Sequence, residues 1–151
     1  MRDKVRTCLW FAKDGLAAAR FYVSLLPGSR LETDPDGPEP MVVNFILAGT
    51  PYQILNGGPH FRLSEAASIS VTTEDQAETD ALWAALVAGG GEESRCGWLK
   101  DRWGLSWQIV PRRLPELLAS PDRAGAARAE AALLEMGRID IAALDRAFAG
   151  S

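Results

Sequence analysis

The sequence has 151 residues, 47% of them apolar and 24% charged, which predicts one globular domain that buries roughly 70% of the surface of its unfolded chain. Sixteen basic residues stand against twenty acidic ones, for a net charge of -4, so we expect no cationic surface for nucleic acid or anionic lipid. Cys8 and Cys96 are far apart and no stretch approaches about 18 consecutive apolar residues, so we expect a cytoplasmic protein without disulfides and no association with membranes.

The first half of the chain predicts a strand, a helix and three further strands. Aromatic and β-branched runs indicate the strands, and Asp14 precedes an apolar-periodic stretch that ends at Pro27-Gly28, which is the pattern of a capped helix. The last two strands are separated only by Ala48-Gly49-Thr50, which predicts a hairpin. The expected elements are a strand at 5–11, a helix at 16–26 and strands at 29–32, 41–47 and 51–55.

The same order of elements repeats after a loop at 56–65. A strand with alternating residues leads through Thr73 and Gln76, spaced as a capping box, into an amphipathic helix that three glycines end. Both halves place an aromatic-Gln-Ile sequence on the last strand, at Gln53 and Gln108, and the period is roughly 55 to 60 residues. An internal repeat is therefore predicted. The expected elements are a strand at 66–73, a helix from 78 to the glycines at 89–91, and strands at 92–96, 98–101 and 105–110.

Beyond Pro111 the pattern changes to helices. Ser120-Pro121 and Asp140 are expected to begin two of them, and Gly137 ends the Ala-rich helix between. Apolar residues are too frequent for helices that face only water, so we expect them to cover the chain's own sheet or that of a partner. These residues are Leu114, Leu117, Leu118, Leu133, Leu134, Met136, Ile139, Ile141, Leu144 and Phe148.

Together these elements predict an α+β fold of two paired βαβββ modules within 1–111, at 5–56 and 66–111, with a helical extension of the same domain at 112–151. The motifs TCLWF, FYVSLLPGSR, LNGGPHF, CGWLKDRWGLSWQIVP and MGRIDIAALDRAF occur in this order, from about Thr7 to Gly150. In this combination the chain resembles the PhnB-like branch of the vicinal oxygen chelate superfamily. The resemblance implies the glyoxalase/bleomycin resistance/dihydroxybiphenyl dioxygenase fold. It also implies the label that members of this branch commonly have, 3-demethylubiquinone-9 3-methyltransferase.

The residues do not support the methyltransferase chemistry of that label. A Rossmann-type methyltransferase needs a Gly-rich turn between a strand and a helix, in a parallel α/β framework. Here the glycines at 89–91 follow a helix and end it. We therefore expect no cofactor and rank this activity last among the hypotheses.

The resemblance also implies where a metal would bind, namely on the first and fourth strands of each repeat. By the repeat register these positions are Thr7, Gln53, Ala66 and Gln108. They supply a hydroxyl, two amides and a methyl group, whereas zinc, iron and manganese are held by thiolate, imidazole or carboxylate ligands. The single histidine, His60, cannot replace such a set, so we expect no metal.

Strand alternation predicts which side chains face the cleft that the resemblance implies. In the first half, Thr7, Leu9, Phe11, Gln53 and Leu55 are expected to face it, and Cys8, Trp10, Tyr52 and Ile54 to face the helix. In the second half, the cleft residues are Ser68, Ser70, Ser106 and Gln108, and the helix side has Ile69, Val71, Trp107 and Ile109. Such a lining suits a small organic ligand held by neutral hydrogen bonds. The predicted ligand-binding residues are Thr7, Phe11, Gln53, His60, Ser68, Ser70 and Gln108.

Several functions remain open at this point. The protein is a small-molecule binder or metal-independent enzyme, or a non-catalytic sequestering protein of the bleomycin-resistance type. The second hypothesis rests on the single histidine, which does not permit a Ser-His-Asp or Cys-His arrangement, and no catalytic residue is named. A third alternative is a filled barrel in which Gln53 and Gln108 bond each other or water, with His60 as a turn residue.

We also expect a homodimer. Members of the superfamily that the chain resembles usually pair modules between or within subunits, and a strand or the helical tail could be exchanged. Trp98 and Trp103 are expected contact residues, because tryptophan is enriched at interfaces.

Overall fold

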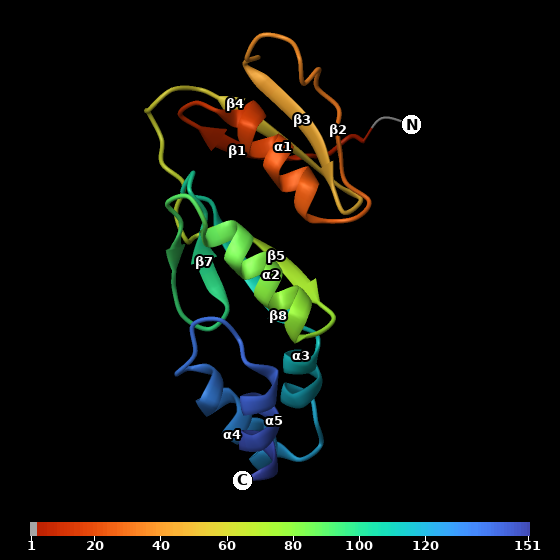
Figure 1. The fold of residues 1–151 in the computed structure, drawn as a ribbon, viewed down its shortest axis with the longest axis vertical. Coiled ribbons are helices and arrows are strands. Elements are labelled where there is room, and N and C mark those ends of the chain that lie inside the picture. Colours follow the sequence, from red (N-terminus) through yellow and green to blue (C-terminus); the bar gives the residue numbers. More distant parts are fainter. Residues whose placement is uncertain (1–2) are drawn as a thin grey trace. The chain divides into compact units, whose positions relative to one another are not determined.

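The structure, a computed structural model, describes residues 3–151 and has the α+β architecture expected of two βαβββ modules (Figure 1). The chain divides into two compact units, one ending at Leu63 and the other beginning at Ser64. Each unit contains one module, and the helical extension belongs to the second unit.

The sheet of the first unit has the strand order β1-β4-β3-β2, with β1 parallel to β4 and the other pairs antiparallel. Helix α1 contacts β2, β3 and β4 and covers one face of this sheet. Leu9, Phe45 and Ile54 are buried between the sheet and the helix, beside Tyr22 of α1. The elements are β1 (Thr7–Phe11), α1 (Gly15–Leu25), β2 (Arg30–Leu31), β3 (Val42–Leu47) and β4 (Thr50–Asn56).

The start of α1 differs from the prediction. Asp14 makes no side-chain cap and has a φ of 65°, in the left-handed region. Instead, the Asn56 Oδ1 accepts a hydrogen bond from the Gly15 N–H (2.9 Å), and the Glu39 Oε1 accepts one from the Leu16 N–H (3.0 Å). Asn56, which we expected in the loop at 56–65, therefore ends β4 and satisfies one of the free amides of the helix.

The second unit repeats this topology, with the strand order β5-β8-β7-β6 and a parallel β5–β8 pair. Helix α2 contacts β5, β7 and β8. The strand expected at 92–96 is shortened to two residues. The Cys96 and Gly97 amides donate to the Met136 and Gly137 carbonyls instead of extending the pairing with the next strand. The elements are β5 (Ser68–Thr73), α2 (Gln76–Val87), β6 (Glu92–Glu93), β7 (Trp98–Lys100) and β8 (Ser106–Pro111).

The N-terminal cap of α2 is also not the expected residue and lies two residues after it. Asp75, not Thr73, accepts the hydrogen bond from the Glu78 amide (2.8 Å). The Thr73 hydroxyl is buried and bonds the hydroxyl of Thr79 (2.6 Å). Because Asp75 caps the helix, α2 begins at Gln76, two residues before the start expected at 78.

The extension forms three helices that pack on one another, α3 (Arg113–Leu118), α4 (Arg123–Leu133) and α5 (Ile141–Ala149). Asp140 caps α5 as predicted, whereas Asp122 and not Ser120 caps α4. The apolar residues of the tail lie mainly in one cluster, and Leu134 is an exposed exception. Their number therefore gives no reason to expect that they cover a partner. The cluster consists of Leu114, Leu117, Ala129, Ile139 and Leu144, with Val110, Leu118, Leu133, Met136 and Phe148 packed against it.

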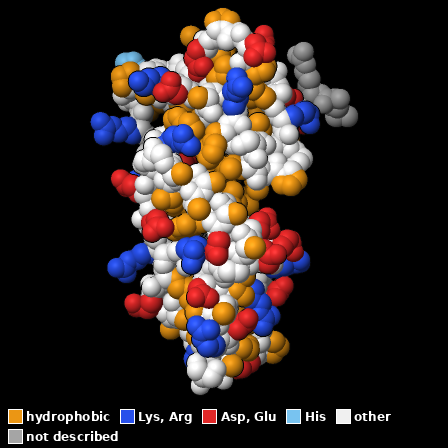
Figure 2. Space-filling model, viewed as in Figure 1, with side chains coloured by type: hydrophobic (Ala, Val, Ile, Leu, Met, Phe, Trp, Pro, Cys, Tyr) orange, Lys and Arg blue, Asp and Glu red, His pale blue; other side chains and the backbone are white. Residues whose placement is uncertain are grey.

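Acidic and basic side chains are interspersed over the surface seen in Figure 2, without a large region of one sign. This distribution agrees with the small net charge. Within residues 3–151, no helix combines the length and the apolarity needed to cross a membrane. Cys8 and Cys96 are both free thiols.

Candidate functional site

Each sheet has one face covered by the helix of its own module, and we call the opposite face the helix-free face. Residues paired on neighbouring strands point to the same face, so the pairing register assigns every strand residue to one side. In the first sheet, Cys8 pairs with Gln53 and Gln53 pairs with Asn44. These three side chains, with Trp10 and Leu55, therefore lie on the helix-free face.

Two predicted ligand residues of the first unit lie on the wrong side for that role. Thr7 pairs with Tyr52, whose ring stacks on Phe45 at 5.6 Å between centroids, and Phe11 is buried at 3% exposure. Both belong to the helix-covered face, together with Leu9. A shift of one residue in the register reverses every side chain of a strand, and Cys8 rather than Thr7 is the neighbour of Gln53.

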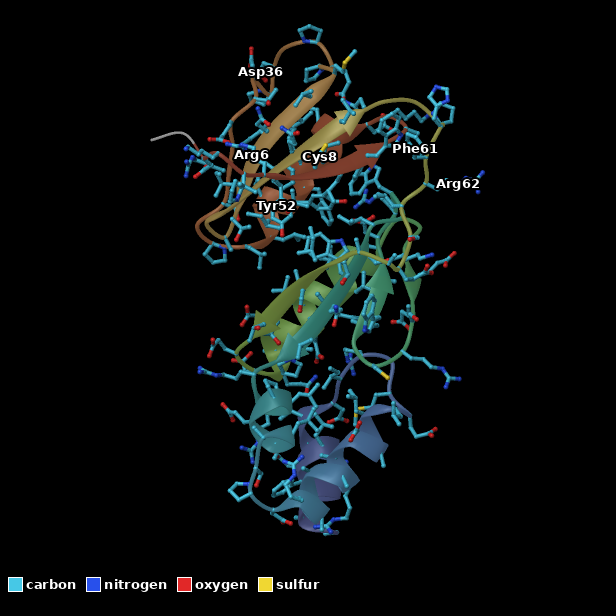
Figure 3. All side chains as sticks on the ribbon, turned by 180° about the vertical axis from the view of Figure 1, so that it is seen from behind. Arg6, Cys8, Asp36, Tyr52, Phe61 and Arg62 are labelled. Atoms are coloured by element: carbon cyan, nitrogen blue, oxygen red, sulfur yellow. The ribbon has the colours of Figure 1, made fainter. Side chains whose placement is uncertain are left out.

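The remaining predicted residues of this unit have ordinary surroundings. Gln53 is half-buried and its Nε2 donates to the Asn44 Oδ1 at 3.3 Å. His60 is exposed in a turn after β4. Near this turn, Phe61 (Figure 3) lies edge-on to Trp10 with 4.8 Å between ring centroids, and the Trp10 Nε1 donates to the Gly58 carbonyl at 2.9 Å.

The second sheet confirms the predicted sorting of its side chains. Buried Ile69, Trp107 and Ile109 face α2, and the polar residues face the other way. The register arranges the helix-free face in two rows across the strands. One row is Ser70, Gln108 and Trp98, and the other is Ser68, Ser106, Lys100 and Glu92. The Gln108 Nε2 links the two rows by donating to the Ser68 Oγ at 2.9 Å.

The four positions that the repeat register gave for a metal need correction at two places. Ala66 lies in a turn before β5, and Ser70 pairs with Gln108 as Cys8 pairs with Gln53. The corrected set supplies one thiol, one hydroxyl and two amides, which still does not match the ligands of zinc, iron or manganese. No group of three or more His, Cys, Asp or Glu suited to a metal ion occurs among residues 3–151.

We predict that the purified protein holds no stoichiometric zinc, nickel, iron or manganese, since a single thiol beside hydroxyl and amide groups does not compensate a divalent ion for its lost hydration. Elemental analysis after extensive dialysis against metal-free buffer measures this. One equivalent of tightly held metal would contradict the prediction and show that the ligand positions are assigned wrongly.

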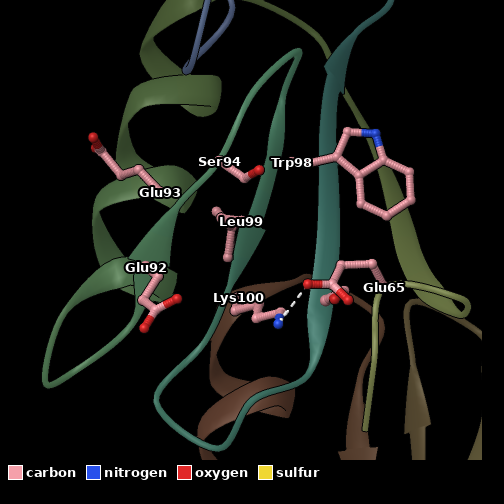
Figure 4. A pocket seen from close by; sticks show the side chains of 8 residues that line it. Glu65, Glu92, Glu93, Ser94, Trp98, Leu99 and Lys100 are labelled. Atoms are coloured by element: carbon pink, nitrogen blue, oxygen red, sulfur yellow. Dashed lines mark ion pairs between the residues drawn. The ribbon is translucent and has the colours of Figure 1, made fainter.

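A cavity of about 340 Å³ opens beside the row that contains Lys100 (Figure 4). The Lys100 Nζ lies 2.6 Å from the Oε1 of Glu65, which precedes β5. The hydrogen bond from Lys100 lowers the pKa of the Glu65 carboxyl and raises the pKa of the Lys100 ammonium group. The residues that line the cavity are Glu65, Glu92, Glu93, Ser94, Trp98, Leu99, Lys100 and Ser106.

Ser106 lines this cavity with a buried hydroxyl that has no hydrogen-bond partner. Its side chain is 1% exposed, and its Oγ is the one buried side-chain polar atom without a hydrogen-bond partner in the part of the chain that the structure describes. An unpaired buried hydroxyl costs free energy, and native proteins hold few such groups. A hydroxyl kept in this state in the wall of a cavity can bond a molecule there once the side chains that cover it move aside.

Ser106→Ala is predicted to stabilise the free protein by about 1 kcal/mol, because it removes an unpaired buried hydroxyl with little change in volume. Urea unfolding of the two proteins measures the difference. Ser68→Ala is the matched control, since it removes the acceptor of the Gln108 amide and should destabilise the protein by about 1 kcal/mol. Equal losses in both variants would show that the Ser106 hydroxyl has a partner in solution.

Of the seven predicted ligand residues, the structure brings Ser68, Ser70 and Gln108 together on one face, and it places Thr7, Phe11, Gln53 and His60 in the other unit. Sequence reasoning did not select Lys100, Glu65, Trp98 or Ser106 as ligand residues. Ser106 was assigned to the correct face, and extending the alternation across the hairpin would have added Trp98 and Lys100. Nothing in the sequence connects the loop residue Glu65 with Lys100.

The duplicated βαβββ topology with two helix-free faces defines a protein of the vicinal oxygen chelate superfamily. The structure is similar to that of the PhnB protein from Bacillus cereus, with 26% identity, a TM-score of 0.63 and coverage of 72% of this chain and 99% of that one. The family model described as 3-demethylubiquinone-9 3-methyltransferase matches residues 3–110, and the chain belongs to this PhnB-like family. The extension at 112–151 lies outside the matched residues.

More distant structures share the fold. A protein from Pseudomonas aeruginosa has 22% identity and a TM-score of 0.58, with coverage of 73% of this chain and 98% of that one. The fosfomycin resistance protein FosX from Listeria monocytogenes has 12% identity and a TM-score of 0.51, with coverage of 74% and 93%. No curated protein matches the chain.

Proposed function

We propose that this protein binds a small organic molecule on the helix-free face of its second sheet, without a metal ion. The observation that carries the proposal is the buried, unpartnered Ser106 hydroxyl beside a cavity of about 340 Å³. The size is in the range of small-molecule sites, which combine apolar walls with a few placed polar groups. On this face Trp98 supplies an apolar side chain, and Lys100 and Ser106 supply polar groups.

Thermal-shift screening and NMR titration with aromatic and quinone-like compounds test this proposal. We expect ligands that raise the melting temperature and move the indole N–H signal of Trp98. Trp10 is an internal control, because its indole N–H bonds the Gly58 carbonyl at 2.9 Å in the first unit, which supplies no residue of the cavity lining, and its signal should not move. A panel without any binder, or shifts confined to residues far from Trp98, would contradict the proposal.

A non-catalytic sequestering protein is the second candidate function. The lining of the described cavity contains no histidine and no cysteine, so it offers no nucleophile activated by imidazole. A glyoxalase/bleomycin resistance protein from Albidiferax ferrireducens shares the fold, with a TM-score of 0.50. Incubation of a bound compound with the protein, followed by mass spectrometry, separates the two functions, because conversion of the compound would identify an enzyme.

The methyltransferase activity named by the family is not supported by the glycines at 89–91. They follow α2, and Gly89 and Gly90 have φ values of 75° and 119°, so they form the turn from a helix into β6 and not a turn that begins a helix. Calorimetric titration with S-adenosylmethionine should therefore show no binding. Saturable binding would restore this function.

A homodimer remains our prediction, although its basis has changed. The tail residues pack with one another, so the argument rests on the pairing of modules in the superfamily that the chain resembles and on the half-exposed Trp103. Light scattering at micromolar concentration should give about twice the mass of the 16.3 kDa chain. A mass of one chain would contradict the prediction.

A further inference from the structure

The Ser68, Ser106 and Lys100 side chains form a row of hydrogen-bond donors across β5, β8 and β7. Ser68 accepts a bond from Gln108, so its own hydroxyl proton is available to a further acceptor. The Ser106 hydroxyl has no partner, and the Lys100 ammonium has three N–H groups, one of them directed at Glu65. Such a row complements a group with several acceptor atoms and a negative charge.

Glu65 already presents such a group to Lys100. Its carboxylate comes from the segment before β5, and its side chain is 66% exposed, whereas that of Lys100 is 32% exposed. Ion pairs this exposed contribute little to stability, so the carboxylate can leave Lys100 at small cost. An anion that replaces Glu65 on Lys100 again places one negative group beside the ammonium. Glu92 is a second carboxylate in the same row, and it lines the same cavity.

We propose, on the basis of the proposed function, that the cavity takes an organic carboxylate and that Glu65 occupies the carboxylate position on Lys100 until the ligand displaces it. The ligand carboxylate then bonds Lys100 and the Ser106 hydroxyl. Its apolar body lies against Trp98, which is two residues before Lys100 on β7 and points to the same face of the sheet. An amine ligand suits the site less well, because it competes with Lys100 for the same carboxylates and repels the ammonium group.

Three probes of one shape and different charge test the proposal: benzoate, benzamide and benzylamine. Each is titrated into the native protein, Glu65→Gln, Glu92→Gln and Lys100→Met, with the Trp98 indole N–H signal as the readout. We expect Glu65→Gln to raise the affinity for benzoate about two- to five-fold, because it removes the internal competitor. Glu92→Gln is the matched control, since it removes a charge from the same cavity without freeing Lys100, and its effect should be smaller.

Lys100→Met should lower the affinity for benzoate about ten-fold or more, because a hydrogen bond to a charged group is lost. The affinity for benzamide should change little in any variant. Equal benzoate affinities in the native protein and in Glu65→Gln would overturn displacement of Glu65, and tighter binding of benzylamine than of benzoate would overturn the ligand class. Binding of benzamide alone at Trp98 would overturn this inference and leave the proposed function standing, whereas no binding of any probe would overturn both.

Discussion

Replacing Asp101 by alanine is expected to lower the free energy of unfolding by about 3–5 kcal/mol, because a buried carboxylate that holds the β7–β8 turn is lost. Asp101 is 3% exposed. Its Oδ1 accepts hydrogen bonds from the Trp103 and Leu105 amides at 2.9 and 3.1 Å, and its Oδ2 accepts one from the Trp107 indole at 2.9 Å. The substitution removes the shared acceptor of these three hydrogen bonds, and urea unfolding measures the loss.

Asp101→Asn is the control for this variant. It keeps the size of the side chain and one carbonyl oxygen for the two backbone amides, but it presents an amide to the Trp107 indole, so the expected loss is smaller. A loss below about 1 kcal/mol for Asp101→Ala would contradict the prediction, since one ordinary hydrogen bond has that value. The turn also sets the pairing of Lys100 with Ser106. We therefore expect the Asp101 variant that loses more stability to lose more affinity for a ligand in the cavity.

Replacing Gly97 by alanine is expected to cost about 2–5 kcal/mol, because two unfavourable effects combine at this residue. Gly97 has a φ of 83°, and an added Cβ would lie 2.8 Å from the Ile139 Cδ1 and 2.9 Å from the Ile109 carbonyl oxygen. The Gly97 amide also donates to the Gly137 carbonyl at 2.8 Å, which ties the extension to the second sheet. Thermal and urea unfolding measure the cost.

Gly104→Ala separates the two effects. Gly104 has a similar φ of 87°, but no atom lies within 4 Å of an added Cβ. This variant therefore incurs only the backbone strain, about 1–2 kcal/mol for a residue in the left-handed region. Equal losses for Gly97→Ala and Gly104→Ala would show that the extension does not pack tightly behind Gly97.

The extent to which side-chain direction could be predicted differs between the two modules, and the strands β5 and β1 explain why. In β5, Ser68 and Ser70 alternate with Ile69 and Val71, so polarity alone identifies the buried side. In β1, the run TCLWF offers no such alternation, because Cys8 and Trp10 are as suitable for a core as Leu9 and Phe11. Pairing with β4 and coverage by α1 decide between the two registers, and both depend on residues distant in the sequence.

The helix caps show the same division. Asp140 caps α5 from the adjoining position, and sequence reasoning found it. The first amides of α1 are bonded by Asn56 and Glu39, which are 41 and 23 residues away, so the neighbouring Asp14 was a reasonable but wrong choice. A cap supplied by another element leaves no local signal.

The sequence by itself determined the duplicated βαβββ order, the family and the polar face of the second sheet, because periodicity, repeated motifs and turn residues act over short distances along the chain. Only the tertiary structure decided that Cys8 rather than Thr7 neighbours Gln53, that Glu65 meets Lys100, and that the Ser106 hydroxyl has no partner. These features depend on which atoms from separate segments come within hydrogen-bond distance. That distance is set by the packing of the folded chain and is not encoded in any single stretch of residues.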